Sequence, residues 1–399
     1  MSNERLIGKL SDVNGREVVV VEAVRTPIGR GHAEKGWLKD VHPNALLGSV
    51  LTEVIGRAGI DASEVEDVLA GCVQQYGEQG FNVARNAWLQ AGLPYETPAT
   101  TIDRQCGSAQ QAVNFGAAQI AAGVHDVVIG SGVEHMGRIP MFVGRQFEET
   151  VGTALTPELY ERYDLVDQGF SAEMIAEQWS LPRERLDDIG ARSQQRAERA
   201  VEEGRFEREI HPVPVNGHVV STDQGVRPGT TVETLAELKP AFKEDGRITA
   251  GNSSQISDGA AAVLLMSREK ADELGVPARA RVVDQTTVGV DPVLMLTGPI
   301  PATRKILERN RMTIDDIDLF EVNEAFSSVI GAWEDELRPD TDRVNVNGGA
   351  IALGHPLGST GARLLTTLLH ELERSDKERG LVTMCCGGGL GTATLIERV

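Results

Sequence analysis

The sequence predicts an α/β fold of two or three subdomains, and three observations support this class. Short apolar runs, typical of buried strands, alternate with segments that have helical spacing. Many of the 43 glycines fall in short clusters, which indicates tight turns rather than flexible linkers. The length of 399 residues exceeds what one ordinary core accommodates. Strands that alternate with helices favour a mostly parallel sheet covered by helices.

The first third of the chain opens with the apolar run Val18–Val21, which ends at a polar turn and predicts a buried strand. Further strands are predicted at Val68–Val73, Thr100–Asp103 and Val127–Gly130, and helices at Ala45–Ala58 and Cys106–Ala122. The second helix is rich in Ala and Gly, which is typical of a helix packed closely on several sides.

Residues 134–252 are more polar than their surroundings and contain two loop-like stretches. One helix is predicted from Arg183 to Glu203, with Ser180 and Pro182 before it and Gly204 as its end signal. We interpret this segment as an insertion that covers a site.

The alternation resumes after residue 278. The predicted elements are a strand at Val282-Val283, a helix at Ala302–Asn310, strands at Asp318–Val322 and Leu381–Met384, and a helix with a leucine face over residues 364–372. Two similar α/β halves are therefore expected around the insertion, residues 1–133 with 253–277 and residues 278–399. Each half has a strand, then a glycine-rich turn with a reactive side chain, then a helix.

Charge and hydropathy exclude several classes of partner. The net charge of −20 and the lack of a basic run argue against a nucleic-acid partner. No stretch approaches the ~20 apolar residues that span a bilayer, so no membrane insertion is expected. Met1–Arg16 lacks the apolar core of a signal peptide. Because the chain is so acidic overall, a pocket for anionic phosphates would need a local cluster of basic side chains.

The cysteines are Cys72, Cys106, Cys385 and Cys386. Their number and spacing fit neither a disulfide framework nor the paired C-x-x-C spacing of a zinc site. We therefore expect free thiols, no metal and a reducing, cytoplasmic setting.

Cys106 lies where a predicted strand gives way to a helix. Amide N–H groups at a helix start favour negative charge, so we expect a lowered pKa for this thiol. Gly107 and Ser108 allow the backbone to approach a substrate oxygen closely. The alternative is a buried, inert cysteine that packs as a small apolar side chain.

His355 lies in a turn rich in glycine, from Asn347 to Gly361, and Pro356 excludes regular helix at this position. An imidazole there can accept a thiol proton or donate to an oxyanion. The alternative is a histidine in a packed loop.

Cys385 and Cys386 precede three consecutive glycines, so a thiol capable of acid–base chemistry lies beside exposed amide donors. An adventitious pair or a phosphate loop is the alternative, although the Lys of a P-loop is missing. Asn323 follows a predicted strand, where its amide could hold a water.

Five motifs, taken together and in this order, resemble the thiolase family over nearly the whole chain, from about Val18 to Val399. They are Asp103-Arg-Gln-Cys106-Gly-Ser, Gly251-Asn-Ser-Ser254-Gln-Ile-Ser-Asp-Gly-Ala, Asn323-Glu-Ala-Phe326, Gly354-His355-Pro and Cys385-x-Gly387-Gly-Gly.

The resemblance implies a role for each matched residue. Cys106 would be the nucleophile that carries the acyl group, and Cys385 the acid and base that serves the acetyl-CoA carbanion and the incoming thiol. His355 would activate Cys106 and, with a water held by Asn323, bind the thioester enolate. The N–H groups of Cys106 and Gly387 would bind the tetrahedral oxyanion. Cys386 occupies a variable position and receives no role.

The resemblance also implies a fold and ligands. The fold would be two β-α-β-α-β-α-β-β halves that form a layered αβαβα core, with a loop domain over residues 134–252 against coenzyme A. Ser254 would lie near the pantetheine and Arg227 near the adenine, with Gln168 and Phe326 also contacting substrate. Acyl-CoA and CoA would be substrates, no cofactor would be bound permanently, and a homodimer or homotetramer is expected.

One departure from the family bears on substrate. Where short-chain thiolases carry His-Met-Gly, this chain has Gln168-Gly-Phe170, whereas Asp103–Gln111 and Leu296–Thr303 resemble thiolases of steroid or other bulky-acyl degradation. A bulky or long 3-oxoacyl-CoA is therefore expected, in fatty acid or steroid β-oxidation. The alternatives are an acetoacetyl-CoA-forming enzyme, a decarboxylating condensing enzyme, and a non-catalytic acyl-CoA or lipid-binding protein.

Overall fold

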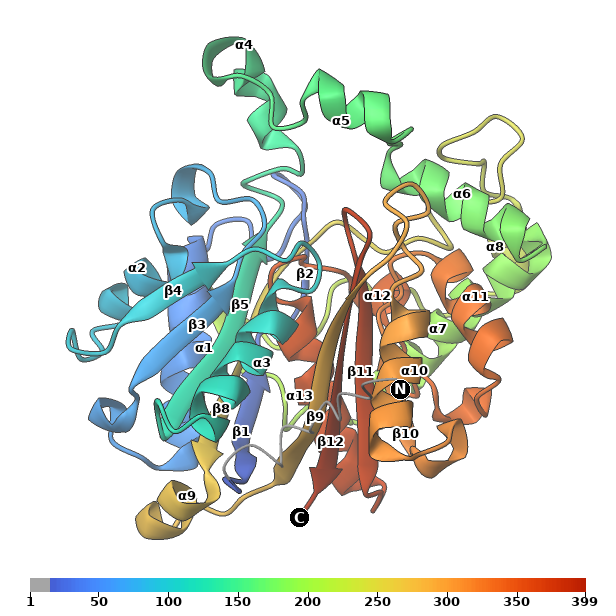
Figure 1. The fold of residues 1–399 in the computed structure, drawn as a ribbon. Helices are drawn as coiled ribbons and strands as arrows, with labels where there is room; N and C mark the ends of the chain where they lie inside the picture. Colours follow the sequence, from blue (N-terminus) through green and yellow to red (C-terminus); the bar gives the residue numbers. More distant parts are fainter. Residues whose placement is uncertain (1–14) are drawn as a thin grey trace.

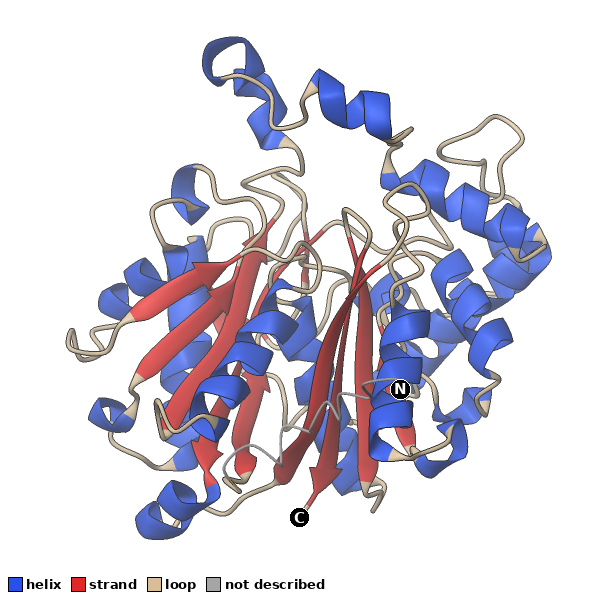
Figure 2. Cartoon of the chain, viewed as in Figure 1, coloured by secondary structure: helices blue, strands red, loops and turns tan. Residues whose placement is uncertain are grey.

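A mixed β-sheet with helices on both faces forms the centre of the molecule (Figures 1 and 2), which confirms the predicted α/β class. The computed structural model describes residues 15–399, so nearly all of the segment Met1–Arg16 lies outside the described residues. Within that range, one sheet has ten strands and a second has two.

The N-terminal half follows the order β-α-β-α-β-α-β-β. Its elements are β1 (Val18–Arg25), α1 (Pro43–Ala58), β3 (Asp67–Gly71), α2 (Val83–Gln90), β4 (Ala99–Ile102), α3 (Ser108–Ala121), β5 (Val127–His135) and, after the insertion, β8 (Ser257–Ser267). In the sheet these strands lie in the order β4-β3-β5-β8-β1, and the short β2 (Gly29–Arg30) pairs with β8. The helix α9 (Arg268–Leu274) then leads to the second half.

The C-terminal half repeats this order, except that its third strand is reduced to a single bridge and a short helix, α12, is added. Its elements are β9 (Ala280–Gly289), α10 (Pro299–Asn310), β10 (Leu319–Val322), α11 (Ser327–Leu337), α12 (Ala350–Leu353), α13 (Thr360–Arg374), β11 (Arg379–Cys386) and β12 (Leu390–Arg398). The strand order is β10-β11-β12-β9. The counterpart of β4 is reduced to a single parallel bridge between Phe320 and Val344.

The expectation of a mostly parallel sheet was wrong. Three strand pairs are parallel (β3 with β4, β3 with β5, and β10 with β11), whereas six pairs of this sheet are antiparallel. The sequence interpretation missed β8 and β12, the last strand of each half. β12 follows β11 after the short turn Gly387–Gly389, and so short a connection joins only antiparallel strands.

The two halves enclose α3 and α13 between them, which gives five layers. One buried cluster combines Val113 and Ile120 of α3 with Leu364 and Leu368 of α13. Helices α1 and α2 cover the outer face of the first half, and α10 and α11 cover that of the second. The small residues of α3 permit this close packing, because a Cβ on Gly116 would lie 2.9 Å from Val128 Cγ1.

The insertion between β5 and β8 contains short helices, a two-stranded sheet and one long helix. Its elements are α4 (Glu148–Val151), α5 (Pro157–Arg162), α6 (Gln168–Gln178), α7 (Arg183–Glu202), β6 (Val213–Val215), β7 (His218–Val220) and α8 (Val232–Ala236). Figure 1 shows α4, α5 and α6 above one end of the strands, over the loops that carry the predicted site residues. Among residues 15–399, no helix has the length and apolar character needed to cross a membrane.

Candidate active site

Cys106 lies in the turn between β4 and α3, directly after Gln105, whose φ of +49° is in the left-handed region. Its side chain is buried, and the backbone N–H groups of Gly387 and of Cys106 itself act on the thiol in the direction that lowers its pKa. Burial, followed by the smaller effects of the Glu134 and Asp103 charges, nevertheless raises the pKa of this thiol to about 11. The expected lowering of this pKa was wrong, because the loss of hydration outweighs the two amide donors.

The β11–β12 hairpin brings a second thiol close to Cys106. Cys385 and Cys386 end β11, and Gly387 opens the turn that follows. Burial raises the pKa of Cys385 well above its usual value, and the nearby Cys106 raises it further. A Cβ on Gly107 would lie 2.6 Å from Cys386 Sγ, so the hairpin packs tightly against the nucleophile turn.

His355 follows α12 and is held by side chains on both ring nitrogens. Nδ1 lies 2.6 Å from Thr360 Oγ1, and Nε2 lies 3.4 Å from the amide nitrogen of Asn323. The Thr360 hydroxyl donates its only proton to the carbonyl of Pro356 at 2.8 Å, so it accepts from His355 Nδ1–H. Nε2 therefore carries the lone pair, and it accepts a long hydrogen bond from the Asn323 NH₂ group. Burial, followed by the charge of Arg363, lowers the pKa of His355 to about 3, so the imidazole is neutral.

The first turns of α3 and α13, the helices that follow Cys106 and His355, pack against each other although 249 positions separate the two residues. Gly361, six residues after His355, lies against Gln110, four residues after Cys106, because a Cβ there would be 2.8 Å from Gln110 Cα. The buried Glu134 carboxylate accepts from Gly358 N–H at 2.9 Å. The same carboxylate raises the pKa of Cys106, so it lies near both turns.

These groups supply the parts of acyl transfer. They provide a thiol that could act as nucleophile, a neutral imidazole whose Nε2 is an acceptor, a second thiol, and backbone N–H groups beside Cys106. Asn323 Oδ1 is buried and has no partner among the described protein atoms, so it can hold a water. Among residues 15–399, no group of three or more His, Cys, Asp or Glu side chains is arranged to hold a metal ion.

The predicted substrate-contact residues are more scattered. The Gln168 side chain reaches Gly387, because its Nε2 lies 3.0 Å from the position of a Cβ on that glycine. Ser254 donates its N–H to Ala325 O at 3.0 Å. Phe326 is buried and makes an edge contact with Phe242. Arg227 is exposed on the insertion, where its N–H donates to Gln194 Oε1.

Sequence reasoning missed three residues that shape the site, namely Gln105, Glu134 and Thr360. Thr360 follows His355 by five residues in the turn already singled out, so proximity in sequence could have indicated it. Glu134 carried no such signal, because its partners come from three separate segments.

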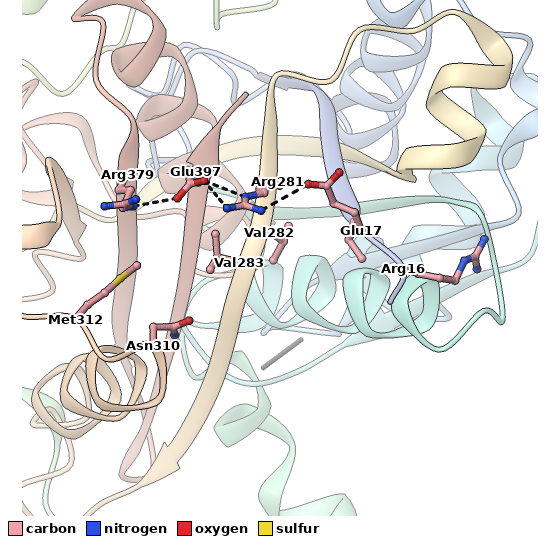
Figure 3. Close-up of a pocket in the computed structure, with 10 residues that line it drawn as sticks. Arg16, Glu17, Arg281, Val282, Val283, Asn310, Met312, Arg379 and Glu397 are labelled. Atoms are coloured by element: carbon pink, nitrogen blue, oxygen red, sulfur yellow. Dashed lines mark hydrogen bonds and ion pairs between the residues drawn. The ribbon is translucent and has the colours of Figure 1, made fainter. Parts of the chain in front are cut away.

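A cavity of about 330 Å³ lies at the opposite end of the strands, where β11 begins rather than ends (Figure 3). Arg281 and Arg379 line it, and both pair with Glu397. Because the carboxylates neutralise these arginines, the cavity offers no strong anion site. It lies apart from the candidate active site.

Comparison with known proteins gives consistent matches over nearly the whole chain. The family models described as "Thiolase, N-terminal domain" and "Thiolase, C-terminal domain" match residues 18–269 and 276–398. The steroid 3-ketoacyl-CoA thiolase FadA6 of Mycobacterium tuberculosis is 46% identical, and the match covers 97% of this chain and 96% of the relative.

Two further relatives carry a different name. An acetyl-CoA acetyltransferase of Syntrophomonas wolfei is 45% identical, with 96% of this chain and 99% of the relative covered. The crystal structure of the Bacillus anthracis acetyl-CoA acetyltransferase superposes with a TM-score of 0.88 at 41% identity, over 96% of this chain and 99% of that one. The thiolase-like fold expected from the sequence is thereby confirmed, and the chain belongs to the thiolase family of acyltransferases.

Proposed function

We propose that this enzyme cleaves 3-oxoacyl-CoA with free CoA, giving acetyl-CoA and an acyl-CoA shortened by two carbons. The observation that carries the proposal is the convergence on Cys106 Sγ of the Gly387 amide and the Cys385 thiol. Carbon–carbon cleavage of a 3-oxoacyl thioester requires a soft nucleophile, a proton source and sites that stabilise two separate anions.

In the first half-reaction, His355 Nε2 takes the proton of the Cys106 thiol while Sγ attacks the 3-oxo carbon. The N–H groups of Cys106 and Gly387 bind the resulting oxyanion. The bond between C2 and C3 then breaks, its electron pair forms the enolate of acetyl-CoA, and the Cys385 thiol protonates C2. In the second half-reaction, the Cys385 thiolate deprotonates CoA, whose sulfur displaces Cys106 from the acyl group, and the leaving Cys106 thiolate recovers its proton from His355.

The pKa values determine how the first step proceeds. Because the pKa of Cys106 is raised to about 11 and that of His355 is lowered to about 3, the thiolate–imidazolium pair is not populated in the free enzyme. Proton transfer and attack therefore occur together, once substrate supplies an oxyanion for the two amides.

We propose a bulky or long 3-oxoacyl group as the substrate. The similarity to FadA6, a steroid thiolase, and the replacement of His-Met-Gly by Gln168-Gly-Phe170 support it. The similarity to acetyl-CoA acetyltransferases favours the second candidate, formation or cleavage of acetoacetyl-CoA.

We assign residues 134–252 as a loop domain inserted in the N-terminal half, which comprises residues 1–133 and 253–277. Residues 278–399 form the C-terminal half. The proposed CoA site lies under the loop domain. Ser254 would contact the pantetheine, and the exposed Arg227 would contact the adenine end. CoA is a substrate in this scheme, and no permanent cofactor takes part.

A homodimer or homotetramer in the cytoplasm is proposed for this enzyme. The strand β4 lies at the edge of the sheet, and an uncovered edge is a template for pairing with another chain. Phe81 and Tyr95 beside it are 96% and 73% exposed, which supports a second copy at this edge. The four cysteines are free thiols, which suits a reducing compartment.

The test is thiolysis of acetoacetyl-CoA and of long and bulky 3-oxoacyl-CoA esters, combined with mass spectrometry. Incubation with 3-oxoacyl-CoA in the absence of CoA should add one acyl group to Cys106, and Cys106→Ala should remove that adduct. Higher kcat/KM on acetoacetyl-CoA would select the second candidate. An unmodified enzyme that makes no acetyl-CoA would instead indicate a binding protein.

A further inference from the structure

Two glutamine side chains flank Gly387 next to the nucleophile. From the position of a Cβ on Gly387, Gln168 Nε2 lies 3.0 Å away and Gln105 Oε1 lies 3.3 Å away. Both side chains are half-buried, and they come from α6 and from the turn before α3. The Gly387 N–H group acts on the Cys106 thiol, so both side chains lie close to where an acyl carbon would be attached.

The orientation of the Gln105 amide is fixed by Asp103. The Gln105 backbone N–H donates to Asp103 Oδ1 at 2.7 Å, and the side-chain Nε2 lies 3.3 Å from both carboxylate oxygens. With its NH₂ group engaged there, the Gln105 side chain presents Oε1, an acceptor, toward Gly387. The left-handed backbone of Gln105, with φ +49°, positions this side chain.

Gln168 presents the complementary group. Its Nε2 is a donor, and within residues 15–399 no hydrogen bond engages its side chain. A half-buried donor and a half-buried acceptor thus face the same space, and an aliphatic chain placed there would leave both without a partner.

We propose that Gln105 and Gln168 form a polar clamp for a hydroxyl group on the transferred acyl chain. A hydroxyl both donates and accepts, so it satisfies Gln105 Oε1 and Gln168 Nε2 together. A ketone or a carboxylate has no proton for Gln105, and a carboxylate would also approach Asp103. The clamp rests on the proposed thiolysis and narrows its substrates to 3-oxoacyl-CoA esters that carry a hydroxyl a few carbons beyond C3.

The test compares 3-oxooctanoyl-CoA with its 4-, 5- and 6-hydroxy derivatives. In the wild-type enzyme at least one hydroxylated ester should show a kcat/KM about tenfold above that of the unsubstituted ester, the size expected for neutral hydrogen bonds. Gln105→Met and Gln168→Met, which preserve side-chain length, should each reduce this ratio toward about one. The ratio is taken within each variant, so a loss of folded protein leaves it unchanged.

Gln90→Met is the matched control, because Gln90 is exposed at the end of α2, and it should keep the wild-type ratio. Equal or poorer turnover of every hydroxylated ester would overturn the clamp alone. A ratio that persists in both clamp variants, or that falls equally in Gln90→Met, would also overturn it. Absence of acetyl-CoA from every ester would instead overturn the thiolysis, and the clamp with it.

Discussion

The two halves of the molecule share one strand order but use it for different purposes. β4-β3-β5-β8-β1 in the first half corresponds to the Val344 bridge, β10, β11, β12 and β9 in the second, with the same parallel and antiparallel pairings. Cys106 precedes α3, and His355 precedes α13, its counterpart. Because α3 and α13 are neighbours in the middle layer, this equivalence brings the nucleophile and the imidazole together.

The halves differ at the ends of two equivalent strands, β5 in the first half and β11 in the second. Cys385 lies opposite Gly391 near the end of β11, and Glu134 lies opposite Gly259 near the end of β5. In the proposed mechanism the thiol serves a substrate carbon, whereas the carboxylate is fully occupied by hydrogen bonds. One position would therefore serve chemistry in the second half, and it fixes loops in the first.

The largest effect should follow from removing the nucleophile. Cys106→Ala should lower kcat/KM for thiolysis by roughly 10⁴-fold or more, because the variant lacks the thiol that is proposed to carry the acyl group. The loss of 3-oxoacyl-CoA in the presence of CoA measures it. Cys72→Ala, a buried cysteine beyond the end of β3, is the control. If kcat/KM of Cys106→Ala stays within tenfold of the wild-type value, Cys106 is not the nucleophile of the proposed reaction.

The equivalent test in the first half is Glu134→Gln, which should destabilise the fold by about 3 kcal/mol. The buried carboxylate accepts from the N–H groups of Val73, Gln74 and Gly358 at 2.8, 3.0 and 2.9 Å, and an amide NH₂ cannot accept in their place. Urea unfolding measures the change. Glu148→Gln, at an exposed site in α4, should stay within about 0.5 kcal/mol of the wild type. An unchanged midpoint in Glu134→Gln would show that this strand end is not a structural lock.

A smaller effect should appear where the halves meet beside the nucleophile. Gly107→Ala should cost about 1–3 kcal/mol, because the added Cβ would lie 2.6 Å from Cys386 Sγ. In a Cys386→Ala background the sulfur is absent, so Gly107→Ala should lower the free energy of unfolding by at least about 1 kcal/mol less than it does in the wild type. The free energies of unfolding of the four chains form a double-mutant cycle. Strict additivity would mean that the two turns do not press on each other.

Local sequence patterns predicted most elements and singled out the four candidate site residues, but they did not predict the properties that depend on tertiary contacts. The runs at Val18 and Val68 became strands because apolar side chains need burial, yet an apolar run does not specify the direction of its partner. The parallel sheet was therefore predicted wrongly.

The same limit applies to the site. The sequence indicated amide groups of the helix start beside Cys106, whereas the amides that act on its thiol are those of Gly387 and of Cys106 itself, and burial still raises its pKa to about 11. Glu134 could not be predicted, because its donors become neighbours only after folding.

The smallest expected effect is on stability in acid, to which two buried histidines of the second half should contribute. His355 and His370, both in the second half, are buried with pKa values lowered to about 3 by burial, whereas a histidine in an unfolded chain titrates near 6.5. Between these values the unfolded chain binds protons that the folded chain does not, so stability falls as the pH drops from about 6.5 toward 3.

His370→Gln should remove one of these two contributions. The variant should therefore lose about 1 kcal/mol less free energy of unfolding than the wild type when the pH falls to 5.5. Urea unfolding at pH 7.5 and at pH 5.5 measures the difference, with His218→Gln, on the exposed strand β7, as the control. If His370→Gln loses as much stability between the two pH values as the wild type, protonation of this histidine does not drive acid unfolding. The acid-sensitive element would then have to be sought outside α13.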